Sequence, residues 1–197
     1  MNDVIFETVV TTVAPDGKPH IAPMGVRYVG EQVVLMPFKP STTLDNIDAT
    51  GHAVLNIVID TRVFAGCVTG RRDWPVLSAE QVPGVRLACA LRHIELRLAE
   101  RSDDAQRPVL QMARVHEATH AGFKGFNRAQ AAVIEAAVLV SRLHMLPPQK
   151  VQSEFAYLQI AIDKTAGPEE HEAWGWLTAA VQRQLANQTH DKLEGTI

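Results

Sequence analysis

Residues 37–47 read PFKPSTTLDNI, and this stretch decides how we interpret the first half of the chain. An extended segment ends at Phe38, and a lysine, a proline and three hydroxyl side chains follow at 39–43. A Ser-Thr-Thr cluster with acidic residues close behind it is typical of a helix start, so we predict a short helix over 41–50. Backbone N–H groups at a helix N-terminus attract anions, and hydroxyl and ammonium groups add donors and positive charge. The chemistry of this stretch therefore suits a phosphate group.

The same residues have an interpretation that needs no ligand. Thr42 and Asp45 are three positions apart, which is the spacing of a capping box that satisfies the first N–H groups of a helix. Spacing alone leaves the phosphate site and the capping box open as alternatives.

The segments on either side of this stretch have the composition of β-strands. They are rich in Val, Ile, Phe and Thr, and turn signals such as PDGKP at 15–19 separate them. The predicted strands are residues 4–13, 20–29, 32–38, 52–60 and 86–101. Between the last two we predict a helical turn at 62–69 and an irregular loop at 70–85.

The composition changes after Gly125, where alanine and long aliphatic residues become frequent. Asn127 is a plausible N-cap, and proline and glycine residues punctuate the segments that follow. We predict helices over 129–145, 149–165 and 169–187. The sequence therefore predicts two domains, a β-rich one at 1–124 and a helical extension at 125–197.

The overall composition excludes several classes of protein. The chain has 197 residues, 46% of them hydrophobic and 21% charged, with a net charge of −3, as is ordinary for a soluble globular protein. No basic block supports nucleic-acid binding. The longest nearly uncharged stretch, 129–141, is too short to span a membrane. With no signal-peptide pattern and only two cysteines, we expect a cytoplasmic protein.

Residues 116–120 read HEATH, a literal match to the zinc-peptidase pattern H-E-x-x-H. That chemistry needs both histidines one turn apart on a helix, whereas in a strand they would be about 13 Å apart. The segment 109–120 has β-branched residues and no N-cap, and no third ligand follows at the expected spacing. We therefore predict a strand and no metal site, and keep a zinc-dependent hydrolase acting through His116, Glu117 and His120 as an alternative.

Several motifs now stand in a recognisable order. A Thr-rich strand at 7–12 is followed by APMGV at 22–26, KPSTTLDNI at 39–47 and VLNIV at 54–58, with Phe64 soon after. This order resembles the flavin-reductase-like FMN-binding split-barrel family. The whole chain is most similar to an uncharacterised branch of that family with a C-terminal helical extension.

The resemblance implies a mainly β fold with an α extension: a Greek-key split β-barrel of about six strands, followed by a three-helix segment. In the family a basic residue, a Ser and a Thr at alternate positions hold the FMN phosphate, and the second strand lies along the isoalloxazine ring. A later strand and loop, resembled here by 56–64, close over the flavin. The implied FMN contacts are Pro23, Met24, Gly25, Val26, Lys39, Ser41, Thr42, Thr43, Asn46, Asn56 and Phe64.

The implied function is an FMN-dependent oxidoreductase of flavin-reductase type that transfers a hydride or electrons. The resemblance also implies a homodimer with the flavin at the subunit interface, and it assigns no catalytic residue. Pro23-Met24 replaces the Ser/Thr-rich run that the reductases have near the flavin, and no histidine matches their later motif. A non-catalytic FMN-binding protein and a ligand-free structural dimer are therefore alternatives, beside the zinc hydrolase.

Overall fold

A computed structural model describes residues 4–194 of the chain, with side chains described through residue 187. The chain forms two compact units. The first contains residues up to 59 together with 72–123, and the second contains 60–71 together with the residues from 124 onward. The segment 60–71, which the sequence places within the β-rich domain, thus groups with the C-terminal helices.

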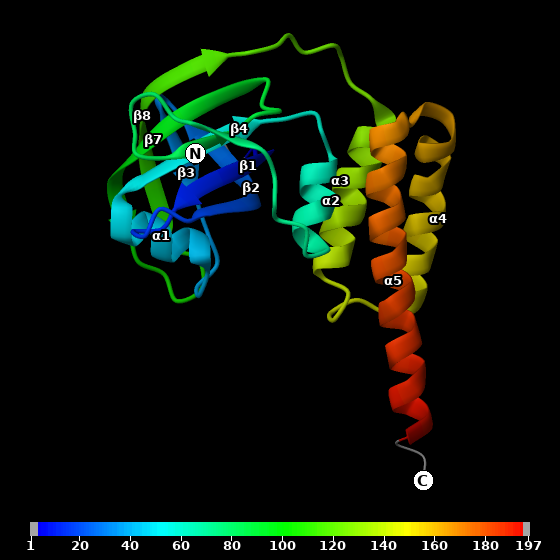
Figure 1. Ribbon diagram of the computed structural model, residues 1–197. Coiled ribbons are helices and arrows are strands. Elements are labelled where there is room, and N and C mark those ends of the chain that lie inside the picture. The colour runs from blue at the N-terminus through cyan, green and yellow to red at the C-terminus, as the bar shows by residue number, and fades with distance from the viewer. Residues whose placement is uncertain (1–3, 195–197) are drawn as a thin grey trace. The chain divides into compact units, whose positions relative to one another are not determined.

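The first unit is a six-stranded closed antiparallel barrel (Figure 1). Its strands are β1 (Phe6–Val13), β2 (Pro19–Val29), β3 (Gln32–Leu35), β4 (His52–Ile57), β7 (Arg92–Ser102) and β8 (Val109–Thr119). They follow one another around the barrel in the order β1-β2-β3-β8-β7-β4. Because β4 returns to lie beside β1, strands β4-β1-β2-β3 form a Greek key. The predicted fold class is confirmed.

Short turns set the register of the first three strands. The β1–β2 pairing runs from Phe6↔Val26 to Val13↔Pro19, and Gly17 has the positive φ of 87° that the connecting turn requires. Strands β2 and β3 are joined by two residues, of which Gly30 has a φ of 57°. Glycine adopts such angles without the steric cost that a Cβ would add.

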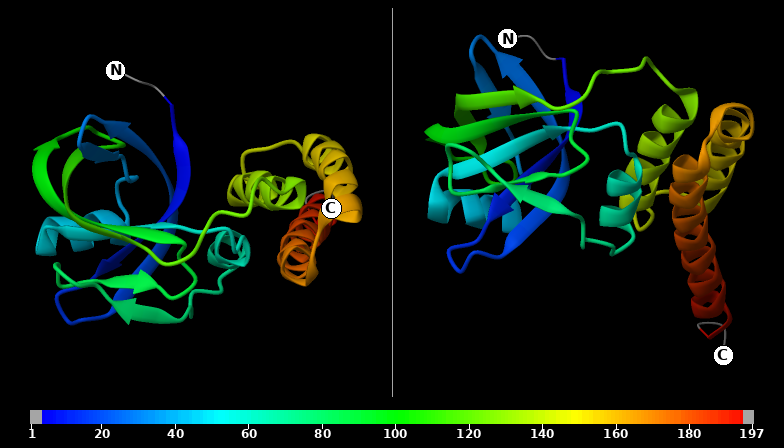
Figure 2. Two further views of the ribbon diagram at one scale, coloured as in Figure 1. Left: turned by 90° about the horizontal axis from the view of Figure 1, so that it is seen from above. Right: turned by 45° about the horizontal axis from the view of Figure 1, so that its top comes forward.

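The strands curve around a common interior, as both views of Figure 2 show. Apolar side chains from every strand of the barrel fill this interior. Helix α1 (Thr42–Thr50) contributes Leu44 and Ile47 to this core. Both are at most 3% exposed, and burial of each such side chain stabilises the fold by roughly 1.5–3 kcal/mol. The predicted helix at 41–50 therefore exists, and its inner face is anchored in the barrel.

The predicted irregular loop at 70–85 and the predicted strand at 86–101 are each wrong in part, because residues 76–87 contain a small two-stranded sheet and the long strand begins only at Arg92. Strand β5 (Val76–Ser78) pairs with β6 (Val85–Leu87) in antiparallel register. Each strand has only three residues, too few to show an alternating pattern in the sequence.

The second unit is helical. It consists of α2 (Arg62–Val68), α3 (Arg128–Ser141), α4 (Pro148–Thr165) and α5 (Pro168–Glu194). Asn127 is the N-cap of α3, as predicted, and its side-chain oxygen accepts hydrogen bonds from the amides of Ala129 and Gln130. Helix α5 continues beyond the predicted end at residue 187. Within the described residues, no helix is long and apolar enough to cross a membrane.

Candidate functional site

The N-terminus of α1 is capped by Ser41. Its backbone is extended, with φ −159° and ψ 146°, and its Oγ accepts a hydrogen bond of 3.3 Å from the Leu44 amide. The predicted capping box of Thr42 and Asp45 is therefore wrong, because Thr42 is already the first helical residue and Asp45 donates its own amide to the Ser41 carbonyl at 3.0 Å. The cap uses one hydroxyl and leaves the first turn open to an anion.

Two backbone amides belong to the first residues of this helix. In the described part of the chain, the N–H groups of Thr42 and Thr43 have no hydrogen-bond partner, as is normal for the first residues of a helix. The Lys39 ammonium is half-exposed and lies 3.7 Å from the Asp103 carboxylate, a distance that contributes little at the surface. Thr43 as a whole is only 2% exposed, whereas Thr42 is an exposed residue, so an anion would reach Thr42 more readily than Thr43.

Strand β2 has one edge without a strand neighbour over the residues predicted to touch the flavin. Residues Pro23 to Val26 pair with β1, where Thr8 Oγ1 donates a 2.8 Å hydrogen bond to the Met24 carbonyl. On the other edge of β2, β3 pairs only with residues 27–29. No other described strand pairs with residues 19–26 on that edge of β2. Backbone groups on that edge can therefore bind a planar polar ring. Val26 itself is fully buried.

The two predicted asparagines stabilise the barrel. Asn56 is fully buried, and its Nδ2 lies 3.1–3.2 Å from the Val9 carbonyl and the Thr11 hydroxyl, while its Oδ1 accepts a 2.7 Å bond from the Leu87 amide. Asn46 is 4% exposed and donates its Nδ2 to Thr12 Oγ1 at 3.0 Å. The Asn56 amide connects strands, and the Asn46 amide connects α1 to β1. Phe64 is also buried, but in α2 of the helical unit.

The HEATH segment lies on β8, as predicted, with His120 immediately beyond the strand. The zinc-peptidase arrangement is excluded, since it requires His116 and His120 on one helical face. The Glu117 carboxylate forms an ion pair with the Arg92 guanidinium instead. The hydrogen bond from Arg92 lowers the pKa of Glu117. It outweighs partial burial, which raises the pKa, so the pKa lies below its usual value.

A buried polar cluster that sequence reasoning missed lies on β7. His93 and Glu95 both have 0% exposure, and His93 Nε2 lies 3.1 Å from Glu95 Oε1. Burial opposes ionisation of Glu95, but amide donors from residues 80–82 and the His93 ring outweigh it and lower its pKa. On the other side of the ring, His93 Nδ1 lies 2.9 Å from His120 Nε2. An alternating strand pattern shows only that these side chains share a face, so the sequence held no signal for the cluster.

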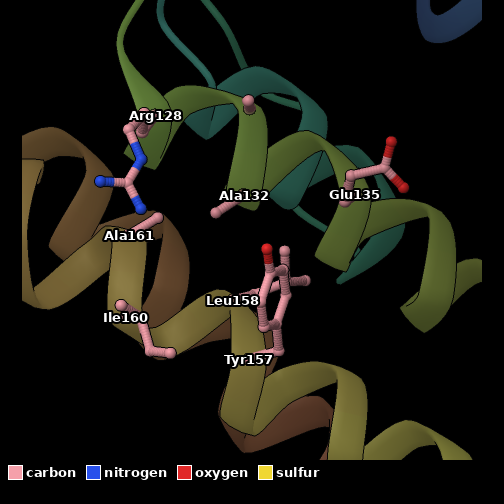
Figure 3. Close-up of a pocket in the computed structure, with 8 residues that line it drawn as sticks. Arg128, Ala132, Glu135, Tyr157, Leu158, Ile160 and Ala161 are labelled. Atoms are coloured by element: carbon pink, nitrogen blue, oxygen red, sulfur yellow. The ribbon is translucent and has the colours of Figure 1, made fainter.

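The helical unit contains a separate pocket of about 240 Å³ between α3 and α4 (Figure 3). The Arg128 guanidinium points toward α4, while the Glu135 carboxylate points away from the Tyr157 ring (Figure 3). Tyr157 is 72% exposed, so the pocket is shaped largely by surface side chains.

The family models match almost the whole chain. Residues 6–121 match the N-terminal domain of a protein family of unknown function, DUF447, and residues 127–179 match its C-terminal part. The chain belongs to the DUF447 family. No curated protein matches it.

Solved structures similar to this DUF447 protein share its fold. An FMN-bound DUF447 protein from Methanosarcina mazei matches with a TM-score of 0.76 and 20% identity, over 89% of this chain and 94% of that one. The Pseudomonas fluorescens 2-nitrobenzoate 2-nitroreductase matches with a TM-score of 0.51 and 21% identity, over 60% of this chain and 67% of that one. Flavoredoxin from Methanosarcina acetivorans matches with a TM-score of 0.51 and 14% identity, over 61% of this chain and 74% of that one. The predicted split-barrel fold with a helical extension is thus confirmed.

Proposed function

We propose that this DUF447 protein binds FMN. The observation that carries the proposal is the full-length similarity to the FMN-bound DUF447 protein, which covers both the barrel and the helical extension. Two features of the barrel support it independently: an α1 N-terminus with open amide donors, and an upstream half of β2 whose second edge has no described strand partner.

The α1 end would hold the FMN phosphate. The amides of Thr42 and Thr43 would donate to phosphate oxygens, the Ser41 hydroxyl lies beside them, and Lys39 adds a positive charge from the preceding turn. The helix dipole favours the negative charge at the same point. Residues 23–26 of β2 would lie along the isoalloxazine ring. Asn46 and Asn56 would act indirectly: Asn46 holds α1 against β1, and Asn56 holds β4 against β1, the strand that pairs with β2.

Bound FMN would supply hydride or electron transfer, and the protein would supply binding and orientation. We propose an oxidoreductase of flavin-reductase type, because two similar folds belong to a nitroreductase and a flavoredoxin. A non-catalytic FMN-binding protein is the second candidate, since Pro23 and Met24 stand where a reductase has a Ser/Thr-rich run.

We also propose a homodimer. Val4, Ile5 and Phe6, at the start of β1, are about half-exposed and form an apolar surface beside residues 25 and 26 of β2. A second copy covering this surface would bury three large apolar side chains.

The deciding experiment is an absorption spectrum of the purified protein, followed by titration with FMN if the protein is colourless. A flavin band, or saturable binding of about one FMN per chain, is the expected result. A protein that is colourless and does not bind FMN would overturn the assignment. Addition of NADH under anaerobic conditions then separates the two candidates, because only a reductase bleaches the flavin band.

A further inference from the structure

Three side chains that are far apart in the sequence converge on the outer face of β7 and β8. One carboxylate oxygen of Glu80 and one ring nitrogen each of His93 and His116 lie within 4.8 Å of one another. We propose that Glu80, His93 and His116 bind a divalent transition-metal ion. The site is distinct from the proposed flavin contacts.

The strand register brings the two histidines together. Ile94 and Leu96 belong to the barrel core, so the alternation of β7 turns His93 and Glu95 to the opposite face. On β8, His116 is the direct partner of Glu95, and it therefore projects from the same face as His93. Cross-strand neighbours on one face are close enough for their side chains to meet.

Glu95 is not a ligand itself but positions two of the three ligands, Glu80 and His93. Its carboxylate accepts hydrogen bonds from the amides of Glu80, Gln81 and Val82, at 2.6, 2.7 and 2.8 Å, and so holds the loop that carries the Glu80 side chain. The same carboxylate lies 3.1 Å from His93 Nε2, which leaves Nδ1 as the lone-pair donor of that ring. A carboxylate behind a histidine is the usual outer shell of a metal site, because it fixes the tautomer and the ring orientation.

His116 supplies an independent observation. Its Nε2 atom is buried and has no hydrogen-bond partner among the described residues, although it lies 3.3 Å from a Glu80 carboxylate oxygen. The contact has the distance of an ion pair without the geometry of a hydrogen bond. A buried imidazole nitrogen without a partner is costly, and a cation shared with Glu80 would satisfy it.

The donor set selects the class of ion. Two imidazole nitrogens and one carboxylate suit Zn²⁺ and neighbouring first-row ions, whereas Mg²⁺ and Ca²⁺ prefer oxygen ligands alone. Ligands at about 2.1 Å from one ion are at most about 4.2 Å apart, so a pair of atoms at the 4.8 Å limit would have to approach slightly. The Glu80 side chain is 56% exposed and can make this movement. Binding through His93 Nδ1 would replace the hydrogen bond that this atom now shares with His120.

Of the three residues that a zinc peptidase would use in HEATH, only His116 belongs to this site. Glu117 follows His116 on β8, so its side chain leaves the opposite face of the strand. It is the cross-strand partner of Ile94, and its carboxylate contacts Arg92. Glu117→Gln is therefore a matched control for Glu80→Gln: each removes one exposed acidic charge, and only Glu80 belongs to the proposed site.

The test is titration of the chelator-treated full-length protein with Zn²⁺ by isothermal titration calorimetry. We expect about one ion per chain, with binding weakened about tenfold or more in Glu80→Gln and in His116→Ala, and unchanged in Glu117→Gln. His144→Ala, in the helical unit, is a second control and should also leave binding unchanged. Circular dichroism of each metal-free variant checks its folding, and the visible spectrum of the Co²⁺-loaded unmodified protein tests for coordination without any substitution.

Absence of saturable Zn²⁺ binding together with a Co²⁺ spectrum like that of the aqueous ion would overturn the proposal. So would equal losses in Glu80→Gln and Glu117→Gln, which would indicate scattered surface binding. FMN titration of the same variants separates this proposal from the flavin assignment, because Glu80→Gln should keep its FMN affinity.

Discussion

His93 Nε2 lies 3.1 Å from the Glu95 carboxylate, and neither side chain has any exposed surface. Two polar groups in this position need hydrogen-bond partners, because an unpaired buried group costs about 1–3 kcal/mol, more than the roughly 0.5–1.5 kcal/mol that a hydrogen bond contributes. The pair has such partners: three backbone amides on one side and the His120 ring on the other.

Replacing Glu95 by alanine should lower the free energy of unfolding by about 3 kcal/mol or more, because three amides, of which that of Val82 is buried, would lose their acceptor and the buried His93 ring would lose its partner. Urea denaturation of the metal-free protein measures this loss. Glu95→Gln keeps one carbonyl acceptor and should lose less. A loss below about 1 kcal/mol in Glu95→Ala would show that water replaces the carboxylate at no large cost.

Asn56→Ala should destabilise the barrel by about 2–4 kcal/mol even without FMN, because the amide connects β1, β4 and β6 from a fully buried position. Thermal unfolding of the flavin-free protein tests this. Unchanged stability combined with lost FMN binding would instead make Asn56 a direct flavin contact.

Lys39→Ala and Ser41→Gly should each weaken FMN binding by about tenfold to a hundredfold, since charged hydrogen bonds contribute about 1.5–3 kcal/mol. Glycine is a tolerated N-cap residue, so Ser41→Gly should preserve α1 at a cost of a few tenths of a kcal/mol. Fluorescence titration with FMN measures the affinity. Lys150→Ala, a lysine of α4 in an exposed pair with Glu154, is the matched control and should bind FMN normally.

The loop between β7 and β8 should loosen in acid. Amides of Arg107 and Gln106 donate to the Asp104 carboxylate and hold its pKa below the usual value. Its stabilising contribution is therefore present above the pKa of an unfolded aspartate, about 3.9, and is lost as the pH falls through the lower folded value. NMR titration should place the Asp104 inflection below that of Asp104 in the unfolded chain. An inflection at or above the unfolded value would contradict the two hydrogen bonds.

Local patterns in the sequence determined much of the fold. Alternating β-branched residues and turn signals located the barrel strands, and the Ser-Thr-Thr cluster located α1. The strand at HEATH and the Asn127 cap were also predictable, because both depend on neighbours within a few positions. Assigning these pieces to a split barrel with an FMN-binding function needed the resemblance of their order to a known family.

Other features depended on contacts that no local pattern encodes. Ser41 became the cap instead of Thr42 because docking of Leu44 and Ile47 in the core sets where the helix begins. The hairpin of β5 and β6 has too few residues for periodicity to show, and 60–71 joins the helices through packing.

The sequence by itself thus determined the order of the barrel strands and of the helices, and the residues of the proposed phosphate site, since those residues are contiguous. Only the tertiary structure decided that Glu80, His93 and His116 meet. The β7–β8 register and the loop held by Glu95 bring them together, and such long-range pairing leaves no trace in the spacing of the residues along the chain.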